Sequence, residues 1–324
     1  MKREGKLLAA FAVAGALSLA MSGTAQAILS DDQYSLTQPG AELVMPFDNE
    51  PGKASFLLVS NIGGTSFSGG SQITTHWTFW GTNCAELADA SICLTLNDTI
   101  VVDPTDFHSV GKDNGQLGPK INLDGKKGLV TVVAYETDSD CSPFGQSSSL
   151  DDAKILVDNA IVGTFTMADT TAGYSFGNDA FGLGTDDALN PTKVIVPDGN
   201  DVSRFHIQTL NPATVEASLV VLAQLKEQSV GAVIPTATSQ TYSTTYYDTV
   251  ESPTSLPDTK VSCTTFRTIA TGPDALIPDF VTVPSSGIIA LDPTPDLSSD
   301  TYLFGIVGQA VGSFGASGYV KINF

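Results

Sequence analysis

Apolar and β-branched residues are gathered into short runs along this chain, and polar turn residues separate each run from the next. Val, Ile, Thr and aromatic side chains dominate the runs, and these residue types favour β-strands. Helix-forming Glu, Lys and Arg are scarce. The pattern predicts strands at residues 41–47, 54–61, 72–80, 92–102, 129–136, 155–167, 193–196, 204–209, 241–248, 260–269, 287–291, 302–307 and 318–324.

Turn residues lie between these runs, at Gly63-Gly64, Asp124-Gly125, 197–200 and 293–295. Gly supplies positive φ and Pro fixes φ, so each pattern is typical of a chain reversal. Many short strands joined by such turns predict an all-β fold. We expect an antiparallel β-sandwich, immunoglobulin-like or jelly-roll-like, of one or two domains.

The segment from 211 to 226 is consistent with either a helix or a strand. Asn211-Pro212 is typical of a helix start, while the apolar run 219–222 suits a buried strand. The strand is favoured because the apolar residues form no one-sided helical stripe.

A stretch rich in Ser, Pro and Gly, residues 142–152, has the composition of a linker or a long surface loop. It divides the chain into a predicted N-terminal β domain, 28–141, and a C-terminal β domain, 153–324. A single interleaved sandwich is the alternative.

Residues 1–27 have the composition of a secretory signal peptide. A basic start is followed by an apolar stretch and by small residues at Thr24-Ala25-Gln26-Ala27. Ile28 follows, where a lipoprotein would have Cys. We therefore expect an exported chain without a lipid anchor, found in the periplasm, at the cell surface or outside the cell, and with no transmembrane helix after cleavage.

The chain is strongly acidic, with 35 Asp and Glu against 15 Lys and Arg, and a net charge of -20. Nucleic acids and anionic lipid surfaces bind through Lys and Arg that neutralise phosphate. The charge therefore argues against both as partners. An acidic surface favours solubility outside the cell or the binding of cations.

Four cysteines, an even number, are predicted to form disulfides in an oxidising compartment rather than a metal site. Cys84 and Cys93 are close in sequence, which favours a bond between them. Cys141 would then be bonded to Cys263. The other pairings stay open, because four cysteines allow three connectivities.

The densest aromatic stretch is residues 73–80. Period-two alternation puts Trp77 and Phe79 on one face of a strand and His76 and Trp80 on the other. His76 and Trp80 are therefore a candidate ligand platform. The alternative is a central strand buried on both faces, with His76 hydrogen-bonded in the interior.

Acidic and amide side chains cluster at turns and are candidate calcium ligands, because calcium prefers several oxygens from loops. The candidates are Asp138, Asp140, Asp198, Asn200 and Asp201. The alternative is that Asp and Asn form local hydrogen bonds in turns. No other cofactor is predicted.

No sequence feature marks an enzyme. The chain lacks a GxSxG nucleophile motif, a P-loop and a dinucleotide fingerprint, and His76, His108 and His206 lie far apart in sequence. A non-catalytic protein is expected.

The C-terminal residues allow two interpretations. Alternation that ends at Phe324 resembles the last strand of bacterial outer-membrane barrels. The uncharged stretch 302–320 contains Gly308 and Gly312 at the spacing of a membrane-helix contact, but its Gly content favours a pair of closing strands.

Together these features predict an exported structural or adhesive protein of a bacterial-type cell surface, matrix or appendage. Its expected partners are other surface or matrix proteins, polysaccharide, or further copies of itself. One alternative is a calcium-dependent binding module or a secreted hydrolase that acts on extracellular polymer. The other is a protein associated with an outer-membrane β-barrel.

Overall fold

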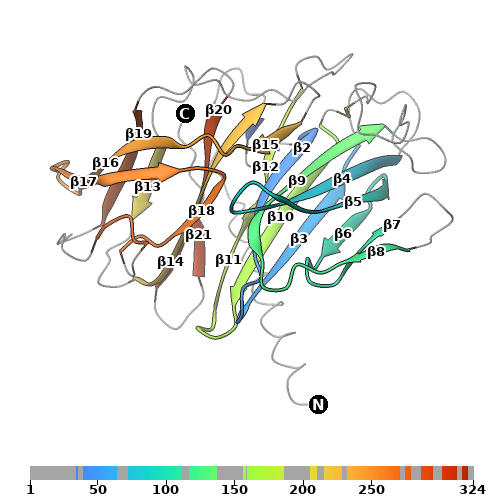
Figure 1. Ribbon diagram of the computed structural model, residues 1–324, viewed down its shortest axis with the longest axis horizontal. Coiled ribbons are helices and arrows are strands. Elements are labelled where there is room, and N and C mark those ends of the chain that lie inside the picture. Colours follow the sequence, from blue (N-terminus) through green and yellow to red (C-terminus); the bar gives the residue numbers. More distant parts are fainter. Residues whose placement is uncertain are drawn as a thin grey trace. The chain divides into compact units, whose positions relative to one another are not determined.

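The structure, a computed structural model, is a layered assembly of antiparallel β-sheets (Figure 1). Every described residue belongs to one compact unit, Gln33–Phe324. No helix occurs among these residues. They are 34–35, 39–63, 72–110, 117–136, 156–157, 159–185, 205–209, 215–227, 232–270, 274–278, 286–294, 301–311 and 316–319.

The first half of the chain supplies most of two sheets and a small hairpin. Sheet A has the order β1-β12-β2-β9-β4-β5, and sheet B has the order β11-β10-β3-β6. Sheet A consists of Tyr34–Ser35 (β1), Phe181–Leu183 (β12), Glu42–Asp48 (β2), Lys127–Glu136 (β9), Gln72–Gly81 (β4) and Glu86–Thr95 (β5). Sheet B consists of Tyr174–Asp179 (β11), Ile161–Asp169 (β10), Lys53–Asn61 (β3) and Thr99–Val102 (β6). The hairpin consists of Phe107–Val110 (β7) and Leu117–Ile121 (β8).

The second half supplies sheets C and D. Sheet C has the order β13-β19-β16-β17; sheet D has the order β15-β14-β20-β21, and β18 also pairs with β14. Sheet C consists of Phe205–Thr209 (β13), Gly287–Thr294 (β19), Gln240–Asp248 (β16) and Pro253–Val261 (β17). Sheet D consists of Val233–Pro235 (β15), Val215–Glu227 (β14), Thr301–Val311 (β20), Ala316–Tyr319 (β21) and Thr264–Arg267 (β18).

Sheets A and B form a sandwich around aromatic rings from β4. Trp77 and Phe79 are fully buried on one face of β4, and their rings lie 6.4 Å apart between centroids. Leu57 of β3 and Phe165 of β10 belong to the same core. Two antiparallel sheets pack in this way through their apolar inner faces.

The other face of sheet A packs against sheet D. Phe181 of β12 lies 5.8 Å from Phe304 and 6.5 Å from Tyr302 of β20, measured between ring centroids. Val221 and Ala223 of β14 join the same core. Sheet A is therefore covered by sheet B on one face and by sheet D on the other.

Sheet D is also buried on both faces, which explains its sequence. In β14, Val221 and Ala223 face the core shared with sheets A and B, while Val220 and Leu222 belong to a second core with sheet C. A strand buried on both faces has no polar alternation. The predicted strand is confirmed, and its double burial explains why the sequence also suited a helix.

The second core contains a close approach that requires glycine. A Cβ added to Gly305 of β20 would lie 2.1 Å from Cζ of Phe205, which is itself buried on β13. We expect Gly305→Ala to lower the free energy of unfolding by about 1–3 kcal/mol, because a well-packed core resists added atoms. Urea denaturation measures this loss. In a Phe205→Leu background the same substitution should cost less, and equal costs in both backgrounds would contradict the contact.

Most predicted strands are confirmed with small shifts at their ends, among them β2, β3, β4, β9, β13, β16, β19 and β20. The predicted pair of closing strands is also confirmed, because β20 pairs with β21. The turns at Gly63 and Gly125 have positive φ. Pro293 instead lies within β19, opposite Tyr242. The predicted strand 193–196, the turn 197–200 and the C-terminal residues after 319 lie outside the described residues.

Two predicted strands are each divided by a turn. The run 92–102 is split at Asn97, which has a φ of 67°, a conformation that Asn tolerates better than most residues. Likewise the run 260–269 is split at Cys263, which has a φ of 52°. The run 155–167 begins later than predicted, at Ile161, because Asn159 also has positive φ.

Strands from beyond the predicted linker pair with strands that precede it. β10 lies antiparallel to β3 over nine residue pairs, and β12 pairs with β2. The expected boundary at 142–152 lies outside the described residues, so the division into two domains stays a prediction.

Candidate functional site

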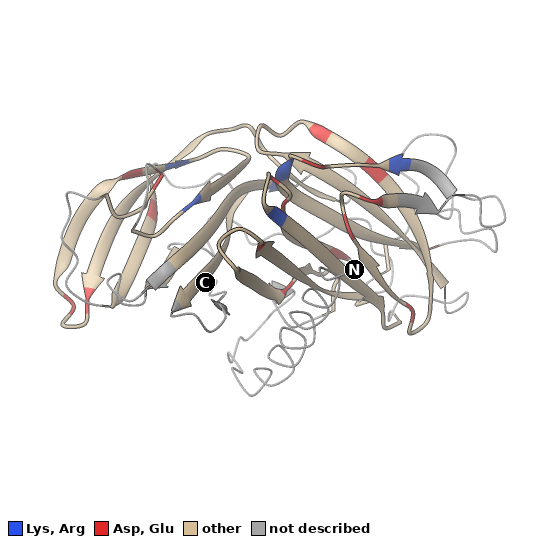
Figure 2. Ribbon diagram, turned by 90° about the horizontal axis from the view of Figure 1, so that it is seen from below, with Lys and Arg blue, Asp and Glu red and all other residues tan. Residues whose placement is uncertain are grey.

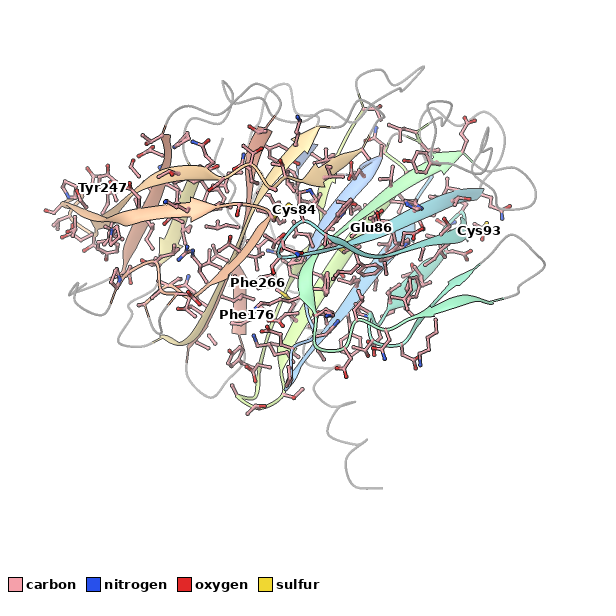
Figure 3. All side chains as sticks on the ribbon, in the orientation of Figure 1. Cys84, Glu86, Cys93, Phe176, Tyr247 and Phe266 are labelled. Atoms are coloured by element: carbon pink, nitrogen blue, oxygen red, sulfur yellow. A yellow bond between two sulfur atoms is a disulfide. The ribbon has the colours of Figure 1, made fainter. Side chains whose placement is uncertain are left out.

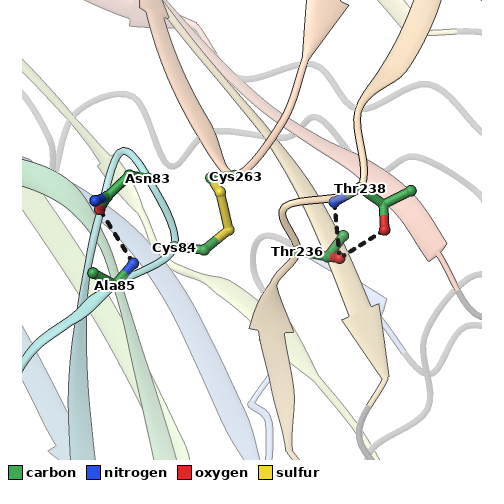
Figure 4. Close-up of a disulfide and its surroundings, with 6 residues drawn as sticks. All are labelled: Asn83, Cys84, Ala85, Thr236, Thr238 and Cys263. Atoms are coloured by element: carbon green, nitrogen blue, oxygen red, sulfur yellow. Dashed lines mark hydrogen bonds between the residues drawn. A yellow bond between two sulfur atoms is a disulfide. The ribbon is translucent and has the colours of Figure 1, made fainter.

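The cysteine pairing differs from the prediction. Cys84 is bonded to Cys263, with 5.2 Å between the Cα atoms and 179 positions between them in sequence (Figure 4). The predicted Cys84–Cys93 bond is wrong because Glu86–Thr95 is a strand rather than a loop, and the predicted Cys141–Cys263 bond is wrong because Cys263 is bonded to Cys84. At about 3.4 Å per residue, Cys93 lies roughly 24 Å along this strand from Glu86, whereas a disulfide needs Cα atoms within about 7 Å. Figure 3 shows Cys84 and Cys93 well apart.

The disulfide joins two turns that hydrogen bonds hold in place. The Cys84 N–H donates to Gly81 O in the turn between β4 and β5. Cys263, between β17 and β18, donates to Thr236 O and accepts from Gln224 N–H. The bond therefore fixes sheet A to the segment that links sheets C and D. Cys93 is also disulfide-bonded, and Cys141 lies outside the described residues.

The candidate ligand platform lies on a central strand. β4 is between β9 and β5, and His76 is 7% exposed. Its Nδ1 lies 3.3 Å from Ser91 Oγ, and the Trp80 indole N–H donates to Thr131 Oγ1 at 3.1 Å. The structure thus agrees with the alternative of a central strand. Ligand binding by His76 and Trp80 stays a prediction.

The predicted calcium ligands all lie outside the described residues: Asp138, Asp140, Asp198, Asn200 and Asp201. Within the described ranges, no group of three or more His, Cys, Asp or Glu side chains is arranged to hold a metal ion. The three histidines lie in three different sheets, since His108 is on β7, opposite Lys120, and His206 is on β13, opposite Ala290. None of the described segments forms a helix long and apolar enough to cross a membrane.

Glu42 is a fully buried acid between sheets A and D. Its Oε2 accepts a hydrogen bond of 2.9 Å from the Val233 N–H of β15. Its Oε1, and Oη of the neighbouring Tyr302, have no hydrogen-bond partner among the described residues. Burial raises the pKa of Glu42 well above its ordinary value, although the bond from Val233 acts in the opposite direction. The carboxyl therefore keeps its proton at pH values where an exposed Glu is ionised.

Charged side chains also link sheet A to sheets B and D. Lys127 Nζ lies 2.9 Å from Glu50 Oε2 and 5.4 Å from the ring centroid of Phe266 on β18. Lys53 pairs with Asp48 at 2.7 Å, and this contact raises the pKa of Lys53 although burial alone would lower it. These contacts join β2, β3, β9 and β18 and have a structural role.

The outer face of sheet B is an exposed surface that carries no charge across three strands. One row of register partners runs from Val101 of β6 through Leu58 of β3 to Thr164 of β10. Val101 is 59% exposed, Thr164 is exposed and Leu58 is half-buried. We call this surface the uncharged face; its residues are Phe56, Leu58, Ser60, Thr99, Val101, Val162, Thr164 and Thr166.

Exposed apolar side chains extend the uncharged face at one end. Ile62, which directly follows β3, is 42% exposed, and Leu96, in the turn before β6, is 43% exposed. A Cβ on Gly63 would lie 3.0 Å from Leu96 Cδ1, so Leu96 lies over the end of β3. Among the described residues, these two and Val101 are three of the five large apolar side chains with substantial exposure.

A smaller apolar patch lies on sheet C. Ile288 of β19, 44% exposed, is opposite Tyr247 of β16, and Tyr247 is opposite Pro253 of β17. Val250, 76% exposed, is in the turn that follows Tyr247. Figure 3 shows Tyr247 far from the disulfide. This patch and the uncharged face belong to different sheets.

Neither surface was identified from the sequence. The signal for the first is β3 itself, KASFLLVSN, in which Phe56 and Leu58 of one face alternate with Leu57 and Val59 of the other. Apolar residues on both faces are typical of a strand covered on both sides, and here only one side is covered by sheet A. Figure 2 shows how little of the strand length carries Asp, Glu, Lys or Arg.

Comparison with protein-family models, curated proteins and solved structures finds no match to this chain.

Proposed function

We propose that this chain is an exported, non-catalytic structural or adhesive protein of the cell surface, the extracellular matrix or an appendage. The observation that carries the proposal is the concentration of exposed apolar side chains on sheet faces. Val101, Ile62 and Leu96 extend one such surface, and Ile288 and Val250 form another. Contiguous apolar patches on a soluble protein mark contacts with other macromolecules.

Export is supported by the covalent bond between distant parts of the chain. The Cys84–Cys263 bond spans 179 positions, and Cys93 is also oxidised. Structural disulfides form and persist in oxidising compartments such as the periplasm and the cell exterior. The predicted signal segment, residues 1–27, supplies a route to such a compartment.

Cell fractionation with thiol trapping tests the proposal. We expect a chain shortened near Ile28, outside the cytoplasm, whose cysteines react with a maleimide only after reduction. The same cells without the chain should lose attachment to each other or to a surface, and the wild-type chain should restore it. A full-length cytoplasmic chain with reactive thiols, or unchanged attachment, would contradict the proposal.

A further inference from the structure

We infer that the uncharged face of sheet B binds a second copy of this chain, with the two faces packed against each other. The inference rests on the proposed structural role and adds the partner and the surface. It starts from Val101, Leu58 and Thr164, which form one cross-strand row, and from Ile62 and Leu96 at the end of β3.

The charge distribution selects the partner. The whole chain has a net charge of -20, so two copies repel each other over most of their surfaces. The uncharged face lacks Asp, Glu, Lys and Arg on β6, β3 and β10. Acids border this face rather than lie on it: Asp179 is on the β11 edge, opposite Thr164, and Asp98 and Asp103 directly precede and follow β6. This face is where two acidic copies can meet with little repulsion.

The chemistry of the face suits a sheet of the same kind. Between β10 and β3 each hydroxyl residue lies opposite an apolar one, in the pairs Val162–Ser60, Thr164–Leu58 and Thr166–Phe56, while β3 and β6 pair Ser60 with Thr99 and Leu58 with Val101. Ser60 Oγ and Thr99 Oγ1 already share a hydrogen bond of 2.7 Å, so one of their two hydroxyl hydrogens is paired within the face. Two such faces can pack at about 10 Å, as the sheets of a sandwich do.

The size of the face is sufficient for a weak dimer. The longest strands of sheet B have nine residues. The three strands of the uncharged face have nine, nine and four residues, which at ~3.4 Å per residue and about 4.8 Å between strands gives roughly 360 Å². Specific, stable interfaces bury about 600–1,000 Å² on each partner, so this face lies below that range and suits a weak, transient contact. Ile62 and Leu96 add to it, and a dimer that dissociates at micromolar concentrations is expected.

Sedimentation velocity of the chain isolated with its disulfides intact tests the inference across a range of concentrations. We expect the wild type to dimerise and Val101→Lys to raise the dissociation constant at least about tenfold, because the substitution puts a charge into each half of the contact. Thr82→Lys is the matched control. It introduces the same charge at an exposed β-branched residue in the turn between β4 and β5, outside both apolar surfaces, and it should leave the dissociation constant unchanged.

Circular dichroism and the melting temperature of monomeric Val101→Lys should match those of the wild type, since Val101 is exposed on an edge strand, where Lys is well tolerated. Dimerisation should strengthen with salt, which screens the remaining repulsion. The inference is overturned if the wild-type chain stays monomeric at all concentrations. It is also overturned if the wild-type chain is monomeric and binds a neutral polysaccharide through this face instead. Equal weakening by both substitutions also overturns it. Export and attachment are measured separately, so the proposed function can stand if the dimer fails.

Discussion

Replacing both Cys84 and Cys263 by Ser is expected to lower the free energy of unfolding by about 3–5 kcal/mol. The bond closes a loop across 179 positions, and the entropy that a cross-link removes from the unfolded chain grows with loop length. It also joins sheet A to the turn between β17 and β18. Urea denaturation under non-reducing conditions measures the loss.

Ser262→Ala is the control for this experiment, because it changes the same turn and leaves the bond intact. It should shift the free energy of unfolding by less than about 0.5 kcal/mol, as surface substitutions do. The double Ser variant should keep its strand content, because the two cores shared by the four sheets remain. A loss below about 1 kcal/mol would show that packing alone joins the sheets.

The stability of the wild type should contain a component that falls as pH rises, and Glu42→Gln should remove it. Burial raises the pKa of Glu42 above its ordinary value of 4.5, so the folded state keeps a proton that the unfolded state releases. This stabilising contribution is complete below pH 4.5 and is lost as pH rises toward the folded-state pKa. Its slope approaches about 1.4 kcal/mol per pH unit within that window.

The measurement is the free energy of unfolding of the two chains from pH 4 to pH 9, compared at each pH. The wild type should lose stability relative to Glu42→Gln as pH rises, because the amide can still accept the Val233 hydrogen bond and never ionises. Glu86→Gln, at an exposed position of sheet A, should run parallel to the wild type. If the difference in free energy of unfolding between the wild type and Glu42→Gln stays constant with pH, Glu42 has the same pKa in the folded and unfolded states and the prediction is wrong.

The strands could be predicted from local residue types, but their partners could not. The run 219–222 in β14 is apolar because both of its faces are buried, and the sequence alone could not distinguish that cause from a helix. The cysteine pairing failed for the same reason. Once Glu86–Thr95 is a strand, Cys84 lies in the turn before it and Cys93 lies near its far end, and the partner of Cys84 is found in a distant turn.

The candidate surfaces were missed because a sequence pattern shows which faces of a strand are apolar. It does not show whether another sheet covers each face. Phe56 and Leu58 indicate that both faces of β3 are apolar, and only the sheet order shows that one face is exposed. Glu42 had a weaker signal, a single acid within the apolar run 41–47. The aromatic run in β4 was more informative, because large rings on both faces require a central strand.

The sheet order also determines which segments of the chain must be present before each sheet can form. Sheet A is complete only when β12, at Phe181–Leu183, reaches β2, and the Glu42 carboxyl then still lacks its partner Val233. Pairings between such distant segments form slowly, because long loops must close before they gain contacts. We therefore expect slow folding, with the edges of sheets A and B unpaired for much of that time. Slow folding of this kind would keep the chain unfolded during the export proposed above, which requires an unfolded chain.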